Sequence, residues 1–358
     1  GRSAPSGEWF VFGDSAVEPG TCSRYGQPKE GQIEDEAQEM KHQVRFWGRP
    51  SSLVSGALTA WMLVAAPPAR AFTARQPLAP AQDAPGVLVS VDWLAERLQD
   101  SSVVLLHVGM PTTPFPGEFI PGARFLNYQD VVQVRNSLIV EMPPIDELVA
   151  RFALAGISDE TLVVLYGSPA HLPARVFVTL DYLGHGARTV VLDGGLEAWK
   201  AAEYPVAENP VEGPTGLFTP RGRGDVLVSA DWIEQRLGDP GITLIDSRPE
   251  GEYTGRIPTR IGGRAGHIPG ARNLYWEDLL VTSANPVLRD FQSVQDRFQG
   301  AGANYGSIVV NYCWVGMRAS YTYLIAKHLG YDTRLYDGSW NEWSKNDSLP
   351  VVTGLFPG

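Results

Sequence analysis

The residue best suited to covalent chemistry is Cys313, in the stretch IVVNYCWVGMRASY. It follows a run of β-branched and aromatic residues that predicts a buried strand, and a helix-like stretch begins after a short loop. Gly316 allows this loop to curl, and Arg318 adds a permanent positive charge at its end. Because the unpaired amides of a helix start favour an anion, we expect Cys313 to exist partly as a thiolate. The pattern indicates a nucleophile for an anionic substrate, or a sulfur anion held on Cys313.

Composition restricts the classes of protein to consider. The chain has 358 residues, of which 44% are hydrophobic and 19% charged, which indicates a globular protein of about two domains. Its formal net charge of -11 argues against a nucleic-acid partner, because phosphate binding depends on clustered Lys and Arg.

The N-terminal part of the chain has the pattern of a leader. Residues 1–39 are rich in Gly, Pro, Ser and acids without a hydrophobic period, so we expect a disordered leader or an upstream translation artefact. Residues 40–71 have the basic start, apolar run and small-residue cleavage site of a signal peptide. The apolar run is shorter than the roughly 20 residues of a membrane span, which favours export over a membrane anchor. We therefore expect a periplasmic protein without stable membrane association.

Cysteine usage leaves two interpretations of Cys313. Cleavage after Ala71 would remove Cys22 and leave Cys313 as the sole cysteine. Exported proteins use cysteines mostly in pairs, as disulfides. A thiol without a partner is either inert and packed as a small hydrophobe, or retained for chemistry.

Two segments of the chain repeat each other. The first begins VLVSVDWLAERLQDSSVVLLHV at Val87, and the second begins VLVSADWIEQRLGDPGITLIDS at Val226. Each continues through an IPGAR phrase, an apolar strand, a helix, and a strand followed by a tryptophan-containing helix. A repeat of this length predicts two copies of one domain. We place the domains at residues 86–206 and 225–352, with a linker rich in Pro, Gly and charge at residues 207–224.

Each copy predicts an α/β domain. Continuous apolar strands alternate with amphipathic helices, which is typical of a parallel sheet flanked by helices on both faces. Ligand sites in such sheets lie beyond the carboxyl ends of strands. Cys313 occupies such a position, directly after its strand.

The two copies differ at the residues that carry the chemistry. Cys313 aligns with Gly167, and the Asp-Ser-Arg segment 246–248 aligns with the His-Val-Gly segment 107–109. The framework phrases, in contrast, are shared. A cysteine that only packs would not require its charged neighbours to disappear from the other copy. We therefore interpret the second domain as catalytic and the first as degenerate.

These features together resemble the rhodanese (sulfurtransferase) family in its tandem, two-domain form. The resemblance rests on GHIPGARN, on VLDGGLEAW and on the strand–Cys–loop–Arg sequence, and it covers roughly residues 87–351. It implies that Cys313 takes the outer sulfur of a small-molecule donor such as thiosulfate and holds it as a persulfide. The sulfur then passes to an acceptor such as cyanide or a thiol. The family implies a monomer and no cofactor.

The resemblance also assigns roles to residues around Cys313. Arg248 matches the family arginine that faces the anionic end of the donor. Asp246 matches the family aspartate near the pocket, or is only a hydrogen-bonded residue at a strand end. The loop that cradles the persulfide would be formed by Cys313, Trp314, Val315, Gly316, Met317 and Arg318.

Other residues near this loop have two interpretations each. Arg256 and Arg260 lie in a Gly-rich insertion and are either donor contacts or solvated loop charges. His267 is better explained as structural than as catalytic. Trp314 and Trp340 would line the pocket or simply pack.

The loop differs from both well-known subtypes of the tandem family. Mercaptopyruvate-type enzymes resemble Cys-Gly-Ser/Thr-Gly-Val-Thr, and thiosulfate-type enzymes resemble Cys-Arg-Lys-Gly-Val-Thr. Val315 stands where those loops have a hydroxyl or a cation. We favour thiosulfate over 3-mercaptopyruvate as the donor, because an arginine-centred site suits a dianion and the hydroxyl is missing.

Two other functions stay open at this point. Phosphatases and arsenate reductases of related fold place five residues between cysteine and arginine, whereas four separate Cys313 from Arg318. A non-catalytic sulfur carrier or binding module would retain the fold for partner recognition. We expect no metal site, because no ligand spacing relates the histidines His107, His171, His185, His267 and His328.

Overall fold

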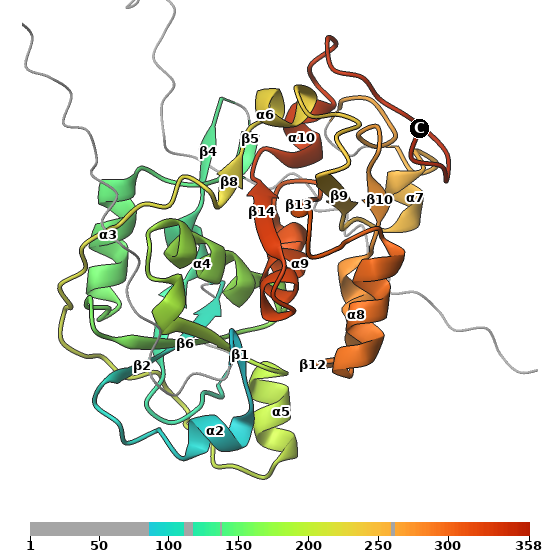
Figure 1. The fold of residues 1–358 in the computed structure, drawn as a ribbon. Helices are drawn as coiled ribbons and strands as arrows, with labels where there is room; N and C mark the ends of the chain where they lie inside the picture. Colours follow the sequence, from blue (N-terminus) through green and yellow to red (C-terminus); the bar gives the residue numbers. More distant parts are fainter. Residues whose placement is uncertain (1–85, 111–116, 137, 259–261) are drawn as a thin grey trace, which may run out of the picture. The chain divides into compact units, whose positions relative to one another are not determined.

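The computed structural model describes residues 86–110, 117–136, 138–258 and 262–358 (Figure 1). All of them belong to one unit of the chain, Arg70–Gly358. The expected leader at residues 1–39 and signal peptide at residues 40–71 lie outside the described residues. Among the described helices, none is long and apolar enough to cross a membrane.

The first repeat folds around a five-stranded parallel sheet. The strand order is β1 (Leu88–Val89), β7 (Thr189–Leu192), β6 (Leu162–Tyr166), β2 (Val103–Gly109) and β3 (Arg124–Asn127). One face is covered by α3 (Ile145–Leu154) and α4 (His171–Tyr182), the other by α2 (Val91–Ala95) and α5 (Gly195–Ala201). The remaining elements are the short helices η1 (Tyr128–Val131) and η2 (Gly186–Arg188) and the hairpin β4–β5 (Gln133–Arg135 and Leu138–Glu141).

The second repeat has the same architecture. Its sheet has the order β10 (Arg272–Asn273), β9 (Ile242–Asp246), β13 (Ile308–Tyr312), β14 (Asp332–Tyr336) and β8 (Leu227–Val228), again all parallel. One face is covered by α8 (Phe291–Gly300) and α9 (Met317–His328), the other by α6 (Ala230–Glu234) and α10 (Ser339–Trp343). The remaining elements are α7 (Glu250–Tyr253), η3 (Trp276–Leu279) and the hairpin β11–β12 (Leu280–Thr282 and Asn285–Leu288). The predicted α/β fold with two tandem domains is confirmed.

The pattern of apolar residues in β13 explains why this strand needs helices on both faces. Successive residues of a strand point to opposite sides of the sheet. Val309 accordingly joins the core cluster below α9, whereas Val310 and Tyr312 join the cluster below α10. A strand buried on both faces is continuous in apolar residues and does not alternate with polar ones.

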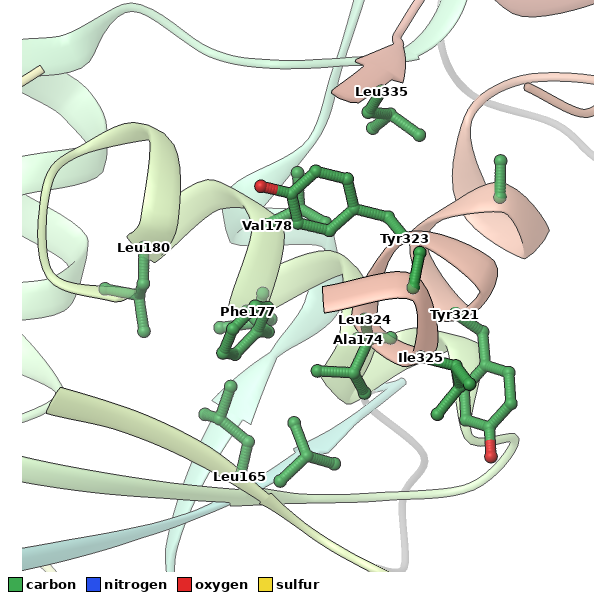
Figure 2. Close-up of a cluster of buried hydrophobic side chains, with 14 of the residues drawn as sticks. Leu165, Ala174, Phe177, Val178, Leu180, Tyr321, Tyr323, Leu324, Ile325 and Leu335 are labelled. Carbon is green, nitrogen blue, oxygen red and sulfur yellow. The ribbon is translucent and has the colours of Figure 1, made fainter. Parts of the chain in front are cut away.

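Helices α4 and α9 pack against each other, so that one hydrophobic cluster contains residues of both repeats (Figure 2). Phe177 and Val178 come from α4, and Leu324 and Ile325 come from α9. This contact fixes the helix that begins beside Cys313 against the first repeat.

A buried carboxylate strengthens the contact between the two helices. Asp181, near the end of α4, accepts hydrogen bonds from the Tyr323 hydroxyl at 2.7 Å and from Arg223 Nη1 at 3.0 Å. Lys327 Nζ also donates to it. Three donors on one buried carboxylate compensate for its lost hydration.

Residues 207–224 form neither helix nor strand and run along the first repeat. The amides of Val211, Gly216 and Arg221 donate to backbone carbonyls of that repeat at 2.7–2.8 Å. The segment is thus a strap held by backbone hydrogen bonds.

Candidate active site

Cys313 is the first residue after β13, and it is fully buried. Its backbone amide donates to Ser339 Oγ at 3.3 Å, and its carbonyl accepts from the Trp340 amide at 3.0 Å. The next carbonyl, that of Trp314, accepts from the Asn341 amide at 2.9 Å. The start of α10 therefore holds the backbone of the cysteine loop in place.

Gly316 ends this loop and caps α9. Its φ of 78° lies in the left-handed region that favours glycine. A Cβ at this position would lie 3.0 Å from both the carbonyl oxygen and Oδ1 of Asp337, and 3.3 Å from Arg175 Nη1. The first amides of α9 have no acceptor within the helix and lie directly after the loop. The loop is thus turned so that a helix N-terminus begins three residues beyond Cys313, at Gly316.

Arg318 lies in the first turn of α9 and forms a bidentate ion pair with Glu252 of α7. Its Nη1 and Nη2 donate to the two carboxylate oxygens at 3.2 and 3.1 Å, and 24% of each side chain is exposed. Burial opposes the charged form of Arg318, but the charges of Cys313 and Glu252 raise its pKa above the ordinary value. Arg318 therefore stays a cation, and its charge favours an anion on Cys313.

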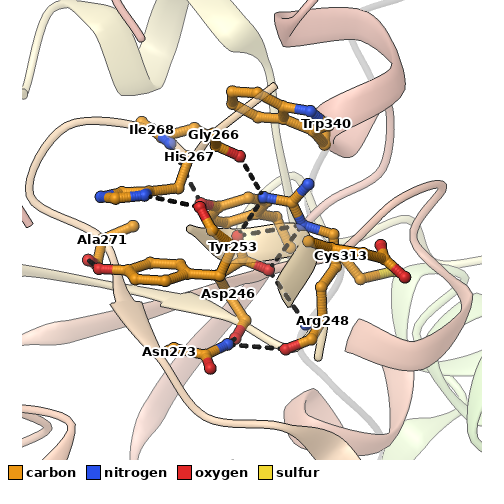
Figure 3. A network of polar contacts seen from close by, with 12 residues as sticks. Asp246, Arg248, Tyr253, Gly266, His267, Ile268, Ala271, Asn273, Cys313 and Trp340 are labelled. Carbon is orange, nitrogen blue, oxygen red and sulfur yellow. Dashed lines mark hydrogen bonds and ion pairs between the residues drawn. The ribbon is translucent and has the colours of Figure 1, made fainter. Parts of the chain in front are cut away.

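Arg248 and Asp246 form a second, fully buried pair (Figure 3). Arg248 Nε donates to both oxygens of Asp246 at 2.9 and 3.1 Å, and Nη2 donates to the Gly266 carbonyl at 2.8 Å. The guanidinium lies 4.7 Å from the centre of the Trp340 ring. Among the described residues, Nη1 of the guanidinium has no hydrogen-bond partner. The structure thus makes Arg248 the partner of Asp246, and its contact with a donor stays a prediction.

The other residues singled out in the sequence have varied positions. Arg260 lies outside the described residues. Arg256 is exposed and pairs with Glu250 at 3.4 Å, away from the buried pairs. His267 is buried, stacks on Tyr253 at 3.8 Å, and has Nδ1 2.9 Å from the Tyr253 carbonyl oxygen. These contacts agree with a structural role for His267.

The hydrophobic residues of the predicted loop pack on both faces of the second sheet. Val315 is buried, and its side chain offers neither a hydroxyl nor a charge. Trp314 packs against the α10 side and Met317 against the α9 side, both partly buried. Trp340 is fully buried and donates its indole N–H to the Arg264 carbonyl at 3.1 Å.

Residues of the first repeat also reach the cysteine loop, and sequence reasoning missed them. Arg175 of α4 is fully buried, and its Nη1 pairs with Asp337, directly after β14. Its Nη2 donates to the Val140 carbonyl at 2.9 Å, and the Met142 amide donates to Asp337 Oδ2 at 3.2 Å. Asp337 lies next to Gly316, since a Cβ on Gly316 would be 3.0 Å from its carbonyl oxygen. Through Asp337, the first repeat therefore supports the cysteine loop.

Tyr128, at the start of η1, is a second contribution of the first repeat. Its hydroxyl is buried and has no hydrogen-bond partner in the part of the chain that the structure describes. Burial raises the pKa of this phenol well above its ordinary value, and the charges of Asp337 and Cys313 act in the same direction. The hydroxyl therefore remains a protonated donor within electrostatic range of Cys313.

The equivalent position in the first repeat cannot carry a cysteine without a backbone shift. A Cβ on Gly167 would lie 2.1 Å from the Val108 carbonyl oxygen. The cavity beside it has a volume of only about 20 Å³ and is partly lined by Pro286 and Tyr321 of the second repeat. These two observations support the interpretation of the first repeat as catalytically degenerate.

Comparisons with known proteins identify relatives over most of the chain. The chain is 32% identical over 263 residues to the thiosulfate sulfurtransferase of Azotobacter vinelandii, covering 72% of this chain and 94% of that protein. It is 28% identical to the sulfur carrier protein TtuD of Thermus thermophilus, covering 75% of this chain and 98% of that protein.

A solved structure shares the fold. SseA from Escherichia coli, described as a 3-mercaptopyruvate sulfotransferase, superposes with a TM-score of 0.62 at 23% identity, over 71% of this chain and 99% of SseA. The sequence profile of the family described as Rhodanese-like domain matches residues 90–202 and again residues 229–346. The chain therefore belongs to the rhodanese-like family, of which it contains two tandem domains.

Proposed function

We propose that the protein transfers sulfane sulfur through a persulfide on Cys313. The observation that carries this proposal is the placement of Cys313 at the carboxyl end of β13, directly before the loop that leads into α9, with Arg318 in the first turn of that helix. A helix N-terminus and a guanidinium both favour a sulfur anion there. Thiosulfate or a related sulfane-sulfur compound is the proposed donor, and a thiol or cyanide is the acceptor.

The proposed reaction has two steps. The Cys313 thiolate attacks the outer sulfur of thiosulfate, the S–S bond of the donor breaks, and sulfite leaves with the bonding electron pair. The acceptor then attacks the outer sulfur of the persulfide, and the thiolate of Cys313 is restored. With cyanide as the acceptor, the product is thiocyanate. The cycle needs no external oxidant or reductant.

The burial of Cys313 sets a condition for this reaction. Because the residue has no exposed surface, a donor reaches the sulfur only when covering side chains move. The backbone of the loop is held by hydrogen bonds to α10, so the moving groups are expected to be side chains. Slow loading followed by a long-lived persulfide is the kinetic behaviour that this enclosure favours.

A sulfur carrier is the second candidate function. The relative TtuD is named as a sulfur carrier protein. An enclosed persulfide would also suit a protein that delivers its sulfur only to a specific partner. A carrier and a turnover enzyme differ in whether a small acceptor releases the sulfur rapidly. That the domains act in the periplasm after removal of residues 40–71 is a separate part of the proposal.

Steady-state thiocyanate formation from thiosulfate and cyanide tests the enzymatic proposal. We expect ping-pong kinetics that Cys313→Ser abolishes. In the uncleaved chain, Cys22→Ser, the same change outside both proposed domains, should retain the activity. Loading of Cys313 without thiocyanate release would support the carrier instead. Cys313-dependent hydrolysis of a phosphate ester, with no sulfur loading, would contradict both and favour an oxyanion enzyme.

A further inference from the structure

Three arginines surround the cysteine loop, and each has its own carboxylate. Arg318 pairs with Glu252, Arg248 with Asp246, and Arg175 with Asp337. The three pairs are formally neutral, so they do not offset the charge of a thiolate on Cys313. In contrast to the expectation from the sequence that an arginine-centred site suits a dianion, these paired arginines match a donor with two negative charges poorly at contact distances.

The pair of Arg318 and Glu252 differs from the other two in its exposure. The side chains of Arg248, Asp246 and Arg175 are fully buried from solvent. Arg318 and Glu252 each retain about a quarter of their side-chain surface. Of these three arginines, Arg318 is therefore the one that a substrate could contact without breaking a buried ion pair.

The geometry of the pair leaves little of Arg318 for an anion. A bidentate carboxylate occupies both terminal nitrogens of the guanidinium, which are the donors that would otherwise bind a sulfonate or carboxylate group. An incoming anion must share these donors with Glu252, and it also experiences repulsion from the Glu252 charge.

We propose that Glu252 is a specificity-determining residue that disfavours dianionic donors such as thiosulfate relative to persulfide donors. This inference rests on the proposed function of Cys313. A persulfide carries at most one charge on its sulfur atoms and does not need a free guanidinium for a sulfonate group. The Cys313 thiolate attacks its outer sulfur, the S–S bond of the donor breaks, and the donor leaves as a thiolate. Thiosulfate still reacts, but the site is better suited to persulfides.

The chain offers a matched control for Glu252. Glu250 lies on the same short helix, α7, and pairs with Arg256, whose side chain is 70% exposed. Glu250→Gln and Glu252→Gln remove the same formal charge and alter the side chain in the same way. Only Glu252→Gln changes the partner of Arg318.

The test measures single-turnover loading of Cys313 by intact mass with two probes, thiosulfate and cysteine persulfide. We expect Glu252→Gln to raise the ratio of the thiosulfate rate to the persulfide rate by about tenfold, since one like charge near the dianion is removed. Glu250→Gln should leave the ratio unchanged. A ratio that stays constant or falls in Glu252→Gln would overturn the inference.

Three further cases keep the result interpretable. If Glu252→Gln fails to fold, Arg318→Gln provides the opposite change, and we expect the same ratio to fall by about tenfold; a constant ratio contradicts the inference. If neither probe loads Cys313 in the unmodified protein, the proposed function itself fails. If both probes load and only the ratio fails to respond, the role of Glu252 alone is rejected.

Discussion

Replacement of Gly316 by alanine probes the link between loop geometry and chemistry. The added Cβ would lie 3.0 Å from the carbonyl oxygen and Oδ1 of Asp337, which is tighter than almost all real contacts of this kind. Asp337 cannot withdraw freely, because it pairs with Arg175 and accepts from the Met142 amide. The strain must therefore move the cysteine loop or loosen the contact with the first domain.

Gly316→Ala is expected to change both the free energy of unfolding and the rate of persulfide formation. A left-handed conformation costs alanine about 1–2 kcal/mol relative to glycine, which lowers the free energy of unfolding by a similar amount. Displacement of a nucleophile by roughly 1 Å lowers the rate by about 10²-fold. We thus expect Gly316→Ala to be modestly destabilised and severely impaired in persulfide formation.

Gly330→Ala is a control that separates the loss of stability from the loss of loading rate. Gly330 follows the other end of the same helix and has a φ of 84°, and no atom of the described residues lies within 4 Å of where its Cβ would be. Its replacement should cost about the same 1–2 kcal/mol in urea unfolding without changing the loading rate. If Gly316→Ala loads Cys313 as fast as Gly330→Ala, the proposed dependence of the chemistry on this loop geometry is refuted.

Three further predictions concern the first domain and its contact with α9. Arg175→Lys should slow single-turnover loading of Cys313, because an ammonium group cannot hold Asp337 and the Val140 carbonyl as the planar guanidinium does; an unchanged rate would contradict this role. Asp181→Ala should lower the free energy of unfolding by about 1–3 kcal/mol in urea titrations, since it leaves the buried Tyr323 hydroxyl and the Lys327 ammonium without their acceptor; a loss below 1 kcal/mol would rule out this explanation. Burial lowers the pKa of His107 from 6.5 to about 4, so the unfolded chain binds more protons between these values and the free energy of unfolding should fall as the pH decreases from 6.5 towards 4. His107→Phe should reduce that fall between pH 7 and pH 5, and an identical pH slope in the variant would argue against the assignment.

The fold was predictable because the same pattern of apolar strands and amphipathic helices occurs in both repeats. The apolar run before Cys313 and the one before Gly167 both become central strands, β13 and β6. The helices that follow them become α9 and α4. A strand that is apolar at successive positions can only be buried on both faces, so periodicity was sufficient here.

The partners of the arginines were not predictable in the same way. Arg318 and Glu252 lie 66 positions apart, and Arg175 and Asp337 lie 162 positions apart. No local pattern joins residues at such separations, because only the packing of whole elements brings them together. One signal was available: the position equivalent to Arg175 in the second repeat is Tyr321.

The comparison of the two repeats does not identify Arg175 as functional. It selects charged residues that are present only in the second repeat. Arg175 is charged only in the first repeat, yet it supports the loop of the second through Asp337. A domain without its own nucleophile therefore still contributes to the candidate active site.

The intact mass of the purified protein after incubation with thiosulfate, or with cysteine persulfide, tests the central claim most directly. We expect the gain of one sulfur atom, its loss on addition of cyanide, and no gain in Cys313→Ser. An unchanged mass with both donors, or a gain that persists in Cys313→Ser, would contradict the assignment of Cys313 as the sulfur-carrying residue.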